Sequence, residues 1–137
     1  MAWRHIDDWH VDSMRAGIEL LSETLGNGPV IARHHRYDIR LRMWLNRGDA
    51  VRWDRPWGIA PAKLSTDRTE LETCVRIDRE QLISGLFYGC EGMRIGGIRK
   101  LRIAPHLAFG ARGVDGVIPP DALVIAELEI LAERKLE

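Results

Sequence analysis

The stretch that decides the fold is LAFGARGVDGVIPPDAL, residues 107–123, which leads directly into the apolar run VIAELEIL. It contains three glycines and the adjacent prolines Pro119 and Pro120. Glycine permits positive φ or a close approach of two backbones, and proline fixes φ and removes an N–H donor. Such a density of restricted backbone positions indicates a shaped loop rather than a flexible linker. Shaped loops on a rigid scaffold often carry function.

Composition limits the class of protein. The chain has 137 residues, which suits one domain with a sizeable core, and 20 basic residues balance 20 acidic ones. A formal net charge of zero gives no general attraction to nucleic acid or to an anionic membrane. No apolar run is long enough to span a membrane, and MAWRHIDDWHVDS lacks the apolar core of a signal peptide. We therefore expect a cytoplasmic protein with neither nucleic acid nor membrane as a partner.

The residues that most often bind metals or form disulfides are sparse. Cys74 and Cys90 lack the Cys-X-X-Cys spacing, and we expect two reduced, packed thiols. The adjacent residues His34 and His35 point to opposite faces if they lie on a strand. No carboxylate or thiol cluster completes a site around them, so we expect no metal.

Hydrophobic periodicity predicts mostly strands. Residues 17–25 fit either a helix or a strand, and residues 52–70 show no clear period, which indicates a long irregular excursion. The segments that are typical of strands are 37–45, 71–77, 97–104 and 122–132. On the first of these, Arg40, Arg42 and Trp44 share one face, which we expect to be a solvated outer face.

One helix is predicted in residues 79–89, REQLISGLFYG, where apolar side chains recur at helical spacing. Asp78 is a good N-cap, with Gln81 at the capping-box position. Gly89 or Gly92 would end the helix. Many antiparallel strands with one short helix give an α+β fold class.

The segment GMRIGGIRKLRIAPHLAFGARGVDGVIPPDALVIAELEIL, residues 92–131, closely resembles the C-terminal half of the FK506-binding (FKBP) peptidyl-prolyl cis-trans isomerases. Upstream, GIELLSETLGNGPV and DIRLRMWLNRGD resemble the first strands and turns of that family. The resemblance covers residues 17–132 and implies an antiparallel half-barrel sheet wrapped around one short helix, with a pocket between them. Residues 1–16 would be an N-terminal extension and residues 133–137 a C-terminal tail.

The activity that this resemblance implies is isomerisation (rotamase activity) of Xaa-Pro bonds in proline-containing peptides or proteins, which assists protein folding. The reaction needs no cofactor and no metal. The amide bond is partly double and its rotational barrier is about 18–20 kcal/mol. An apolar pocket lowers that barrier when it favours the less polar, twisted amide and holds the flanking backbone.

The resemblance assigns the site residue by residue. The paired aliphatic residues at the helix start match Leu82 and Ile83, and those of the loop match Val117 and Ile118. The hydroxyl-bearing aromatic residue of the turn matches Phe109, which keeps the ring and lacks the phenol. Phe109 and Ile83 are the expected catalytic residues.

Three aromatic positions of the family pocket hold aliphatic residues in this chain. The floor tryptophan matches Leu86, the tyrosine of the second strand matches Leu41, and the phenylalanine of the last strand matches Ala126. Each aromatic contact contributes roughly 0.5–1.5 kcal/mol beyond its area, and each 1.36 kcal/mol is a factor of ten in rate. These substitutions predict weakened activity.

The family's Phe-Asp pair has two possible positions: Val51 and Arg52 without a gap, or Trp53 and Asp54 with a two-residue insertion. The second places a catalytic carboxylate at Asp54. It also lets Trp53 or Trp57 fold over the pocket and fill the space left by the missing aromatic rings.

Two functions remain open at this stage. One is a weakened isomerase. The other is a catalytically silent FKBP-fold module that binds a peptide or protein. A third possibility is a structural part of a larger assembly that docks through residues 1–16. The sequence does not indicate an oligomeric state.

Overall fold

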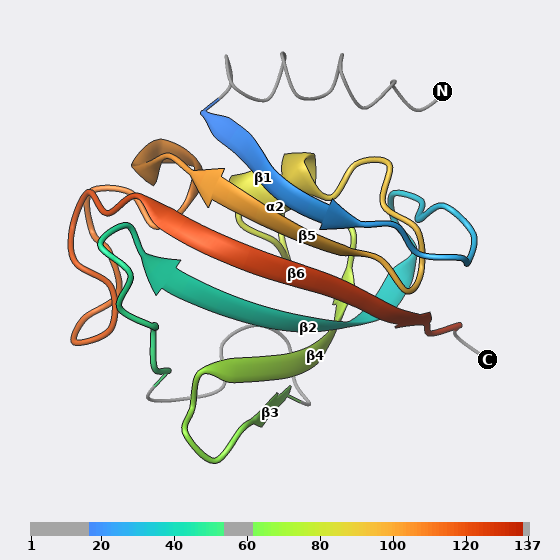
Figure 1. Cartoon of the computed structure of the whole chain (residues 1–137), viewed down its shortest axis with the longest axis horizontal. Coiled ribbons are helices and arrows are strands. Elements are labelled where there is room, and N and C mark those ends of the chain that lie inside the picture. Colours follow the sequence, from blue (N-terminus) through green and yellow to red (C-terminus); the bar gives the residue numbers. More distant parts are fainter. Residues whose placement is uncertain (1–16, 54–61, 136–137) are drawn as a thin grey trace.

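The computed structural model describes residues 17–53 and 62–135 (Figure 1). The predicted N-terminal extension, Asp54, Trp57 and the end of the C-terminal tail lie outside the described residues. Within the described ranges the elements are β1 Ile18–Thr24, β2 Arg36–Leu45, β3 Ala62–Leu64, β4 Glu70–Arg76, α2 Ser84–Gly89, β5 Ile98–Ile103, the 3₁₀ turn η1 Pro105–Leu107 and β6 Val124–Glu133.

The strands form a single antiparallel sheet in the order β1-β5-β6-β2-β4-β3. β2 and β6 form the long central pair, from Tyr37 opposite Glu133 to Leu45 opposite Val124. β5 and β6 are neighbours, so the 107–123 loop joins adjacent strands at one end of the sheet. The curved sheet carries α2 on one side (Figure 1), and this confirms the predicted α+β half-barrel.

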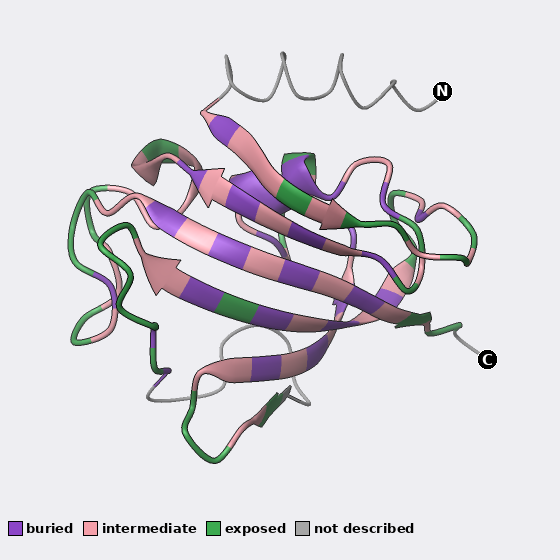
Figure 2. Cartoon of the chain, viewed as in Figure 1, coloured by how far each residue is buried: buried purple, intermediate pink, exposed green. Residues whose placement is uncertain are grey.

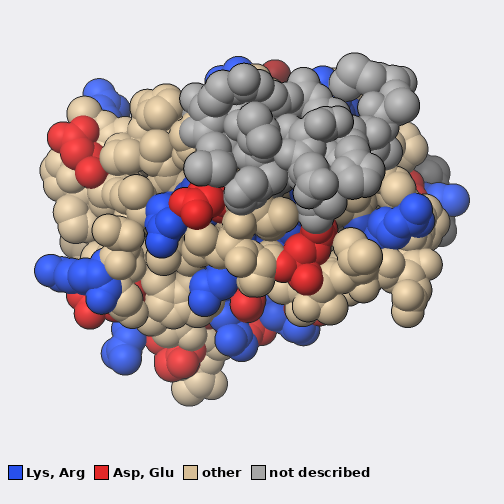
Figure 3. Space-filling view, turned by 45° about the horizontal axis from the view of Figure 1, so that its top comes forward, with Lys and Arg blue, Asp and Glu red and all other residues tan. Residues whose placement is uncertain are grey.

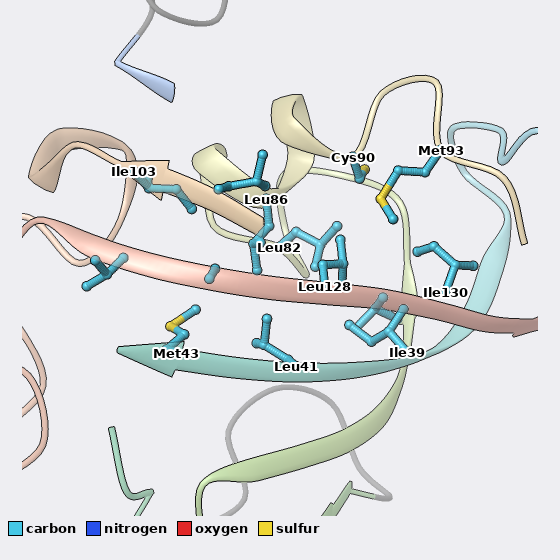
Figure 4. Close-up of a cluster of buried hydrophobic side chains, with 14 of the residues drawn as sticks. Ile39, Leu41, Met43, Leu82, Leu86, Cys90, Met93, Ile103, Leu128 and Ile130 are labelled. Carbon is cyan, nitrogen blue, oxygen red and sulfur yellow. The ribbon is translucent and has the colours of Figure 1, made fainter. Parts of the chain in front are cut away.

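Side chains alternate between the two faces of the sheet, as the period-two pattern predicts. Figure 2 shows the alternation as stripes of buried and partly exposed residues along β5, β6 and β2. Ile39, Leu41 and Met43 of β2 point toward the helix, where Leu82 and Leu86 meet them (Figure 4). This inner face forms the hydrophobic core.

Two segments without a clear period contain strands. Residues 17–25 are resolved as a strand, because β1 pairs with β5 along its length, with a register shift between Leu20 and Ser22. The prediction of an irregular excursion over residues 52–70 is wrong in part, because this segment contains the strand β3, which pairs with β4. Three residues are too few to show an apolar period, and the pairing with β4 defines the strand.

The helix is shorter than predicted. It begins at Ser84 rather than at residue 79, because Ile83 has an extended backbone, with φ −60° and ψ 152°. Asp78 caps a turn rather than the helix. Its carboxylate accepts hydrogen bonds from the backbone N–H groups of Glu80 and Gln81, each at 3.0 Å. The Gln81 side chain accepts from the N–H of Arg76 at 2.6 Å, so the predicted capping box does not form.

A glycine lets the helix lie close to the sheet. A Cβ added at Gly85 would lie 2.9 Å from Cδ1 of Ile103 and closer still to its Cγ2. The next residue, Leu86, has no exposed surface. The helix therefore rests directly on β5, and its start lies beside the loop that follows that strand.

Candidate functional site

The 107–123 loop is a compact, hydrogen-bonded structure. Val114 and Ile118 exchange both backbone hydrogen bonds at 2.8 Å and form an isolated β-bridge. The Gly113 N–H donates to the Phe109 carbonyl at 3.1 Å. Gly113 has φ +62°, and a Cβ there would lie 2.6 Å from the Pro119 carbonyl oxygen. The glycines and prolines therefore shape a hydrogen-bonded loop that leaves Phe109 and Val117 partly exposed and buries Ile118.

The residues predicted as the pocket floor are closed to solvent. Leu41 is 1% exposed, and Leu86 and Ala126 are 0% exposed. Leu82 and Ile118 are also buried. These five residues belong to the hydrophobic core and offer almost no surface to a ligand.

Three predicted site residues keep accessible surface. Ile83, Phe109 and Val117 are partly buried and pack against the core. They come from the start of α2, from the turn after η1 and from the 107–123 loop. Of the predicted site residues in the described ranges, these three keep surface that a ligand could reach.

Ile83 combines an apolar side chain with an available backbone donor. Its carbonyl accepts from the N–H groups of Leu86 and Phe87 at 3.0 and 2.9 Å. Its own N–H has no hydrogen-bond partner within the described residues. An N–H at the start of a helix is a suitable donor for a ligand carbonyl.

Trp53 packs against Phe109. The indole is 2% exposed, and its ring centroid lies 6.1 Å from that of Phe109 at an interplanar angle of 58°. Val51 is equally buried and Arg52 is exposed, so the chain alternates here as a strand does. Trp53 is the excursion tryptophan that the structure places in the core, whereas Trp57 and the predicted carboxylate Asp54 lie outside the described residues.

An acidic turn supports the position of Trp53. The Asp67 carboxylate accepts hydrogen bonds from the hydroxyls of Ser65 and Thr69 and from the Thr69 N–H, and these bonds lower the pKa of Asp67 to about 2. In this turn Arg68 has φ 64°, and its backbone carbonyl accepts a hydrogen bond from the backbone N–H of Trp53 at 2.9 Å. The backbone of Trp53 is thus anchored from the far end of the excursion.

The described part of the site has no ionisable side chain. Ile83, Phe109 and Val117 supply apolar and aromatic surface together with one backbone donor, and Trp53 is buried next to Phe109. Nowhere in residues 17–53 and 62–135 do three His, Cys, Asp or Glu side chains gather as metal ligands. Within the described residues, this arrangement offers apolar surface and a backbone donor, which suit an apolar group that carries a carbonyl.

A hollow of about 380 Å³ lies beside the site, between the 45–47 turn and the loop. It shares Val117 and Ile118 with the candidate site. Its rim carries Arg47, Arg112 and Asp115. A bound peptide could therefore extend along the loop beyond the central apolar surface.

The arginines of β2 form no basic patch. Arg40 contacts Glu72 at 2.8 Å and Glu129 at 3.0 Å, and Arg42 contacts Glu70 at 2.6 Å. Figure 3 shows basic and acidic side chains interspersed on the face in view. Among the described residues, no helix is long and apolar enough to cross a membrane.

Sequence reasoning missed one buried ion pair. Arg99 contacts Glu23 at 2.6 Å, with 5% and 9% of the two side chains exposed. Arg99 also donates to the carbonyls of Gly89 and Glu91 at 2.9 and 2.5 Å, at the end of α2. The alternation along the strand could have indicated it, because Arg99 falls on the same inward face of β5 as Leu101 and Ile103.

Comparison with known proteins gives independent support for the family resemblance. A family model described as FKBP-type peptidyl-prolyl cis-trans isomerase matches residues 63–131, half of the chain. FK506-binding protein 1A of Neurospora crassa is 47% identical over 61 residues, which are 44% of this chain and 51% of that protein. FK506-binding protein of Neisseria meningitidis serogroup A is 51% identical over 51 residues, 37% of this chain and 47% of that one.

The matched segments are partial, since the chain spans about half the length of these curated relatives. A crystal structure of AtFKBP13 superimposes with a TM-score of 0.68 and 24% sequence identity, and covers 87% of this chain and 94% of that one. At that identity the structural likeness concerns the fold alone.

Proposed function

The chain belongs to the FKBP-type peptidyl-prolyl cis-trans isomerase family, and from that premise we propose that residues 17–132 form a prolyl isomerase domain with weakened activity. Its substrates would be Xaa-Pro bonds in proline-containing peptides or proteins, and its role would be in protein folding. A cytoplasmic location is part of the same proposal.

The observation that carries this proposal is that Ile83, Phe109 and Val117 keep accessible apolar surface beside the core. The prolyl ring would lie on this surface, with the Ile83 N–H donating to a substrate carbonyl. The twisted amide is less polar than the planar one, so an apolar surface stabilises it relative to water. Asp54 is the proposed polar group, and Asp54→Asn would test that assignment.

The closed floor supports the weakened activity. Leu41, Leu86 and Ala126 offer almost no accessible surface to a prolyl ring, and Phe109 lacks the phenol hydrogen bond, which would contribute about 0.5–1.5 kcal/mol. A site with fewer such contacts would stabilise the twisted amide less.

The same floor favours the second candidate function, a catalytically silent peptide-binding module. Restoring aromatic side chains with Leu86→Trp and Ala126→Phe would separate the two functions only if the floor were an open cavity. Both positions are 0% exposed, so the added bulk would overpack the core by about 1–3 kcal/mol. Changes at the accessible surface separate the candidates better.

The deciding experiment is a protease-free isomerisation assay by exchange NMR on a series of short Xaa-Pro peptides. We expect catalysed exchange that falls at least tenfold in Phe109→Ala. Phe87→Ala is the matched control, because that ring packs against Arg33 and Tyr88, outside the site. A folded protein without catalysis across the series would remove the isomerase proposal and leave the binding module.

A further inference from the structure

The outer face of the sheet, opposite α2, carries apolar side chains that lie next to each other at one end. The backbone registers pair Glu19 with Arg102 and Arg102 with Ile125. Ile125 in turn pairs with Trp44, so one row crosses the neighbouring strands β1, β5, β6 and β2 (Figure 1). Ile125 and Trp44 are both partly exposed. Paired residues point to the same side of a sheet, so these two side chains form adjacent apolar surface.

This row lies beside a hollow of about 210 Å³, which is lined in part by Gly17, Ala104, Leu123 and Arg102. The Arg102 guanidinium contacts the Glu19 carboxylate at 2.6 Å, and 39% and 38% of the two side chains are exposed. Leu123 is partly exposed and precedes β6 directly. We call this region the corner surface, and it consists of Leu123, Ile125, Trp44 and Arg102.

The outer face differs away from this corner. The next row across β5, β6 and β2 is charged throughout and consists of Lys100, Glu127 and Arg42. At the other end of β5, Ile98 is also partly exposed, but its partners across the sheet are Thr24 and Glu129. Single apolar residues on a surface need no explanation, whereas contiguous ones indicate a site of contact. The corner surface therefore calls for an occupant, and the surroundings of Ile98 do not.

The chain's own residues 1–16, which lie outside the described residues, are close enough in sequence to be that occupant. They join the fold at Gly17, which lines the hollow and accepts a hydrogen bond at its carbonyl from the Ala104 N–H at 2.8 Å. Three strand intervals of about 4.8 Å separate β1 from β2. A stretch of 16 residues spans about 24 Å even at the short rise of a helix. The segment is therefore long enough to reach Trp44.

The sequence of this segment, MAWRHIDDWHVDSMRA, has the chemistry that the corner surface needs. At helical spacing, an arc of about 140° holds the large apolar residues Trp3, Ile6, Trp9 and Met14. The charged residues fall outside that arc, and they are Arg4, Asp7, Asp8, Asp12 and Arg15. The Lys100 ammonium lies 4.8 Å from the Trp44 ring centroid. The three aspartates can therefore supply a carboxylate beside the apolar contact.

We propose that residues 1–16 bind the corner surface of their own chain. Their apolar side chains would lie on Leu123, Ile125 and Trp44, and an aspartate would approach Lys100. No residue of the corner surface belongs to the candidate prolyl site, so this inference does not depend on the proposed isomerase function. The segment then covers the sheet of its own domain and is not an arm that docks into a larger assembly.

The experiment uses the full chain with one spin label on the charged side of the segment. Cys74→Ser removes the partly exposed thiol, and Cys90 is buried, so Asp8→Cys supplies the labelling position. Isoleucine methyl NMR measures the paramagnetic relaxation enhancement at Ile125 against the reduced, diamagnetic label. Ile98 is the matched control, because both side chains point outward and are partly exposed.

We expect the enhancement at Ile125 to be roughly threefold or more that at Ile98, because about 13 Å of β5 separates their rows. Ile125→Glu would remove the contact but could disturb the sheet. The paired change Trp3→Ser and Trp9→Ser lies outside the described fold and should reduce the enhancement at Leu123 and Ile125 positions to that at Ile98. Thr24→Ala, next to Ile98, should leave the enhancement unchanged.

Three results would overturn the inference. One is equal enhancement at Ile125 and Ile98, and another is an enhancement that survives the paired tryptophan change. The third comes from mixing spin-labelled chains with isotope-labelled chains that carry no spin label. Enhancement at Ile125 in that mixture, at the level seen within one chain, would show that the segment binds a second copy. Strong enhancement at Ile83 instead of Ile125 would place the segment at the candidate prolyl site and would also overturn the inference.

Discussion

Both faces of the sheet carry Arg–Glu ion pairs, but the pair on the inner face is buried and those on the outer face are exposed to solvent. On the inner face, Arg99 and Glu23 are almost completely buried and join β1, β5 and the end of α2. On the outer face, the Arg40 side chain is 37% exposed and meets carboxylates from both neighbouring strands. Water screens the outer pair, whereas the inner pair is shielded from water and Arg99 bonds to Glu23 and to two backbone carbonyls. Location therefore decides how much stability is lost when one partner is removed.

The largest effect is expected from Arg99→Ala. It leaves the Glu23 carboxylate buried without its partner and removes two donors from the carbonyls at the end of α2. Breaking a buried pair in this way costs about 3–5 kcal/mol. Urea unfolding measures the loss, and hydrogen exchange should show faster opening of α2. A loss below about 1 kcal/mol would show that the inner pair behaves like the outer one.

The two cysteines give a second comparison of the two faces, because Cys90 lies in the core and Cys74 lies on the outer face of β4. Cys90 is buried in the core, and desolvation raises the pKa of its thiol to about 12. Burial raises the pKa of Cys74 on β4 as well, but that thiol is only partly covered. At pH 8, Cys90 should hold on the order of a thousandfold less thiolate than an ordinary cysteine.

Thiol labelling of the native protein should therefore modify Cys74 first and Cys90 only on unfolding, and a Cys74→Ser variant isolates the slower reaction. Because the folded-state pKa of Cys90 is raised, stability is expected to fall as pH rises from about 9 toward about 12. Rapid labelling of Cys90 in folded protein would contradict the closed inner face.

Gly85→Ala tests how closely the helix lies on the inner face. The added methyl group would overlap Ile103, and overpacking costs about 1–3 kcal/mol. Helix propensity alone favours the substitution by about 1 kcal/mol. Ser84→Ala is the control, one residue earlier in the same helix. A more stable Gly85→Ala variant would show that α2 can move away from β5.

The smallest effect is expected on the outer face. Arg40→Ala removes the contacts with Glu72 and Glu129, and an exposed pair contributes about 0.2–1 kcal/mol. The loss should shrink further at high salt, because exposed charges are screened. The same urea assay, run at low and high ionic strength, checks this. A salt-independent loss as large as that of Arg99→Ala would remove the contrast between the faces.

Local patterns predicted the parts of this protein that depend on local physics. Period-two alternation located β2, β4, β5 and β6 within one or two residues. The glycines and prolines of 107–123 predicted the shaped loop, because positive φ and missing N–H groups are properties of the residues themselves. The same loop supported the resemblance to the FKBP family, which the family model then matched.

The tertiary structure decided what depends on distant partners. Residues 17–25 became a strand because β5 supplies its hydrogen bonds, and the helix began late because Ile83 is extended. Arg99 meets a carboxylate 76 residues away, and Trp53 meets a ring from another turn. Burial and pairing of this kind depend on how the sheet curves, which no short stretch of sequence encodes. The sequence by itself thus determined the family and the loop, and the packing of separate segments decided which of the predicted site residues are buried.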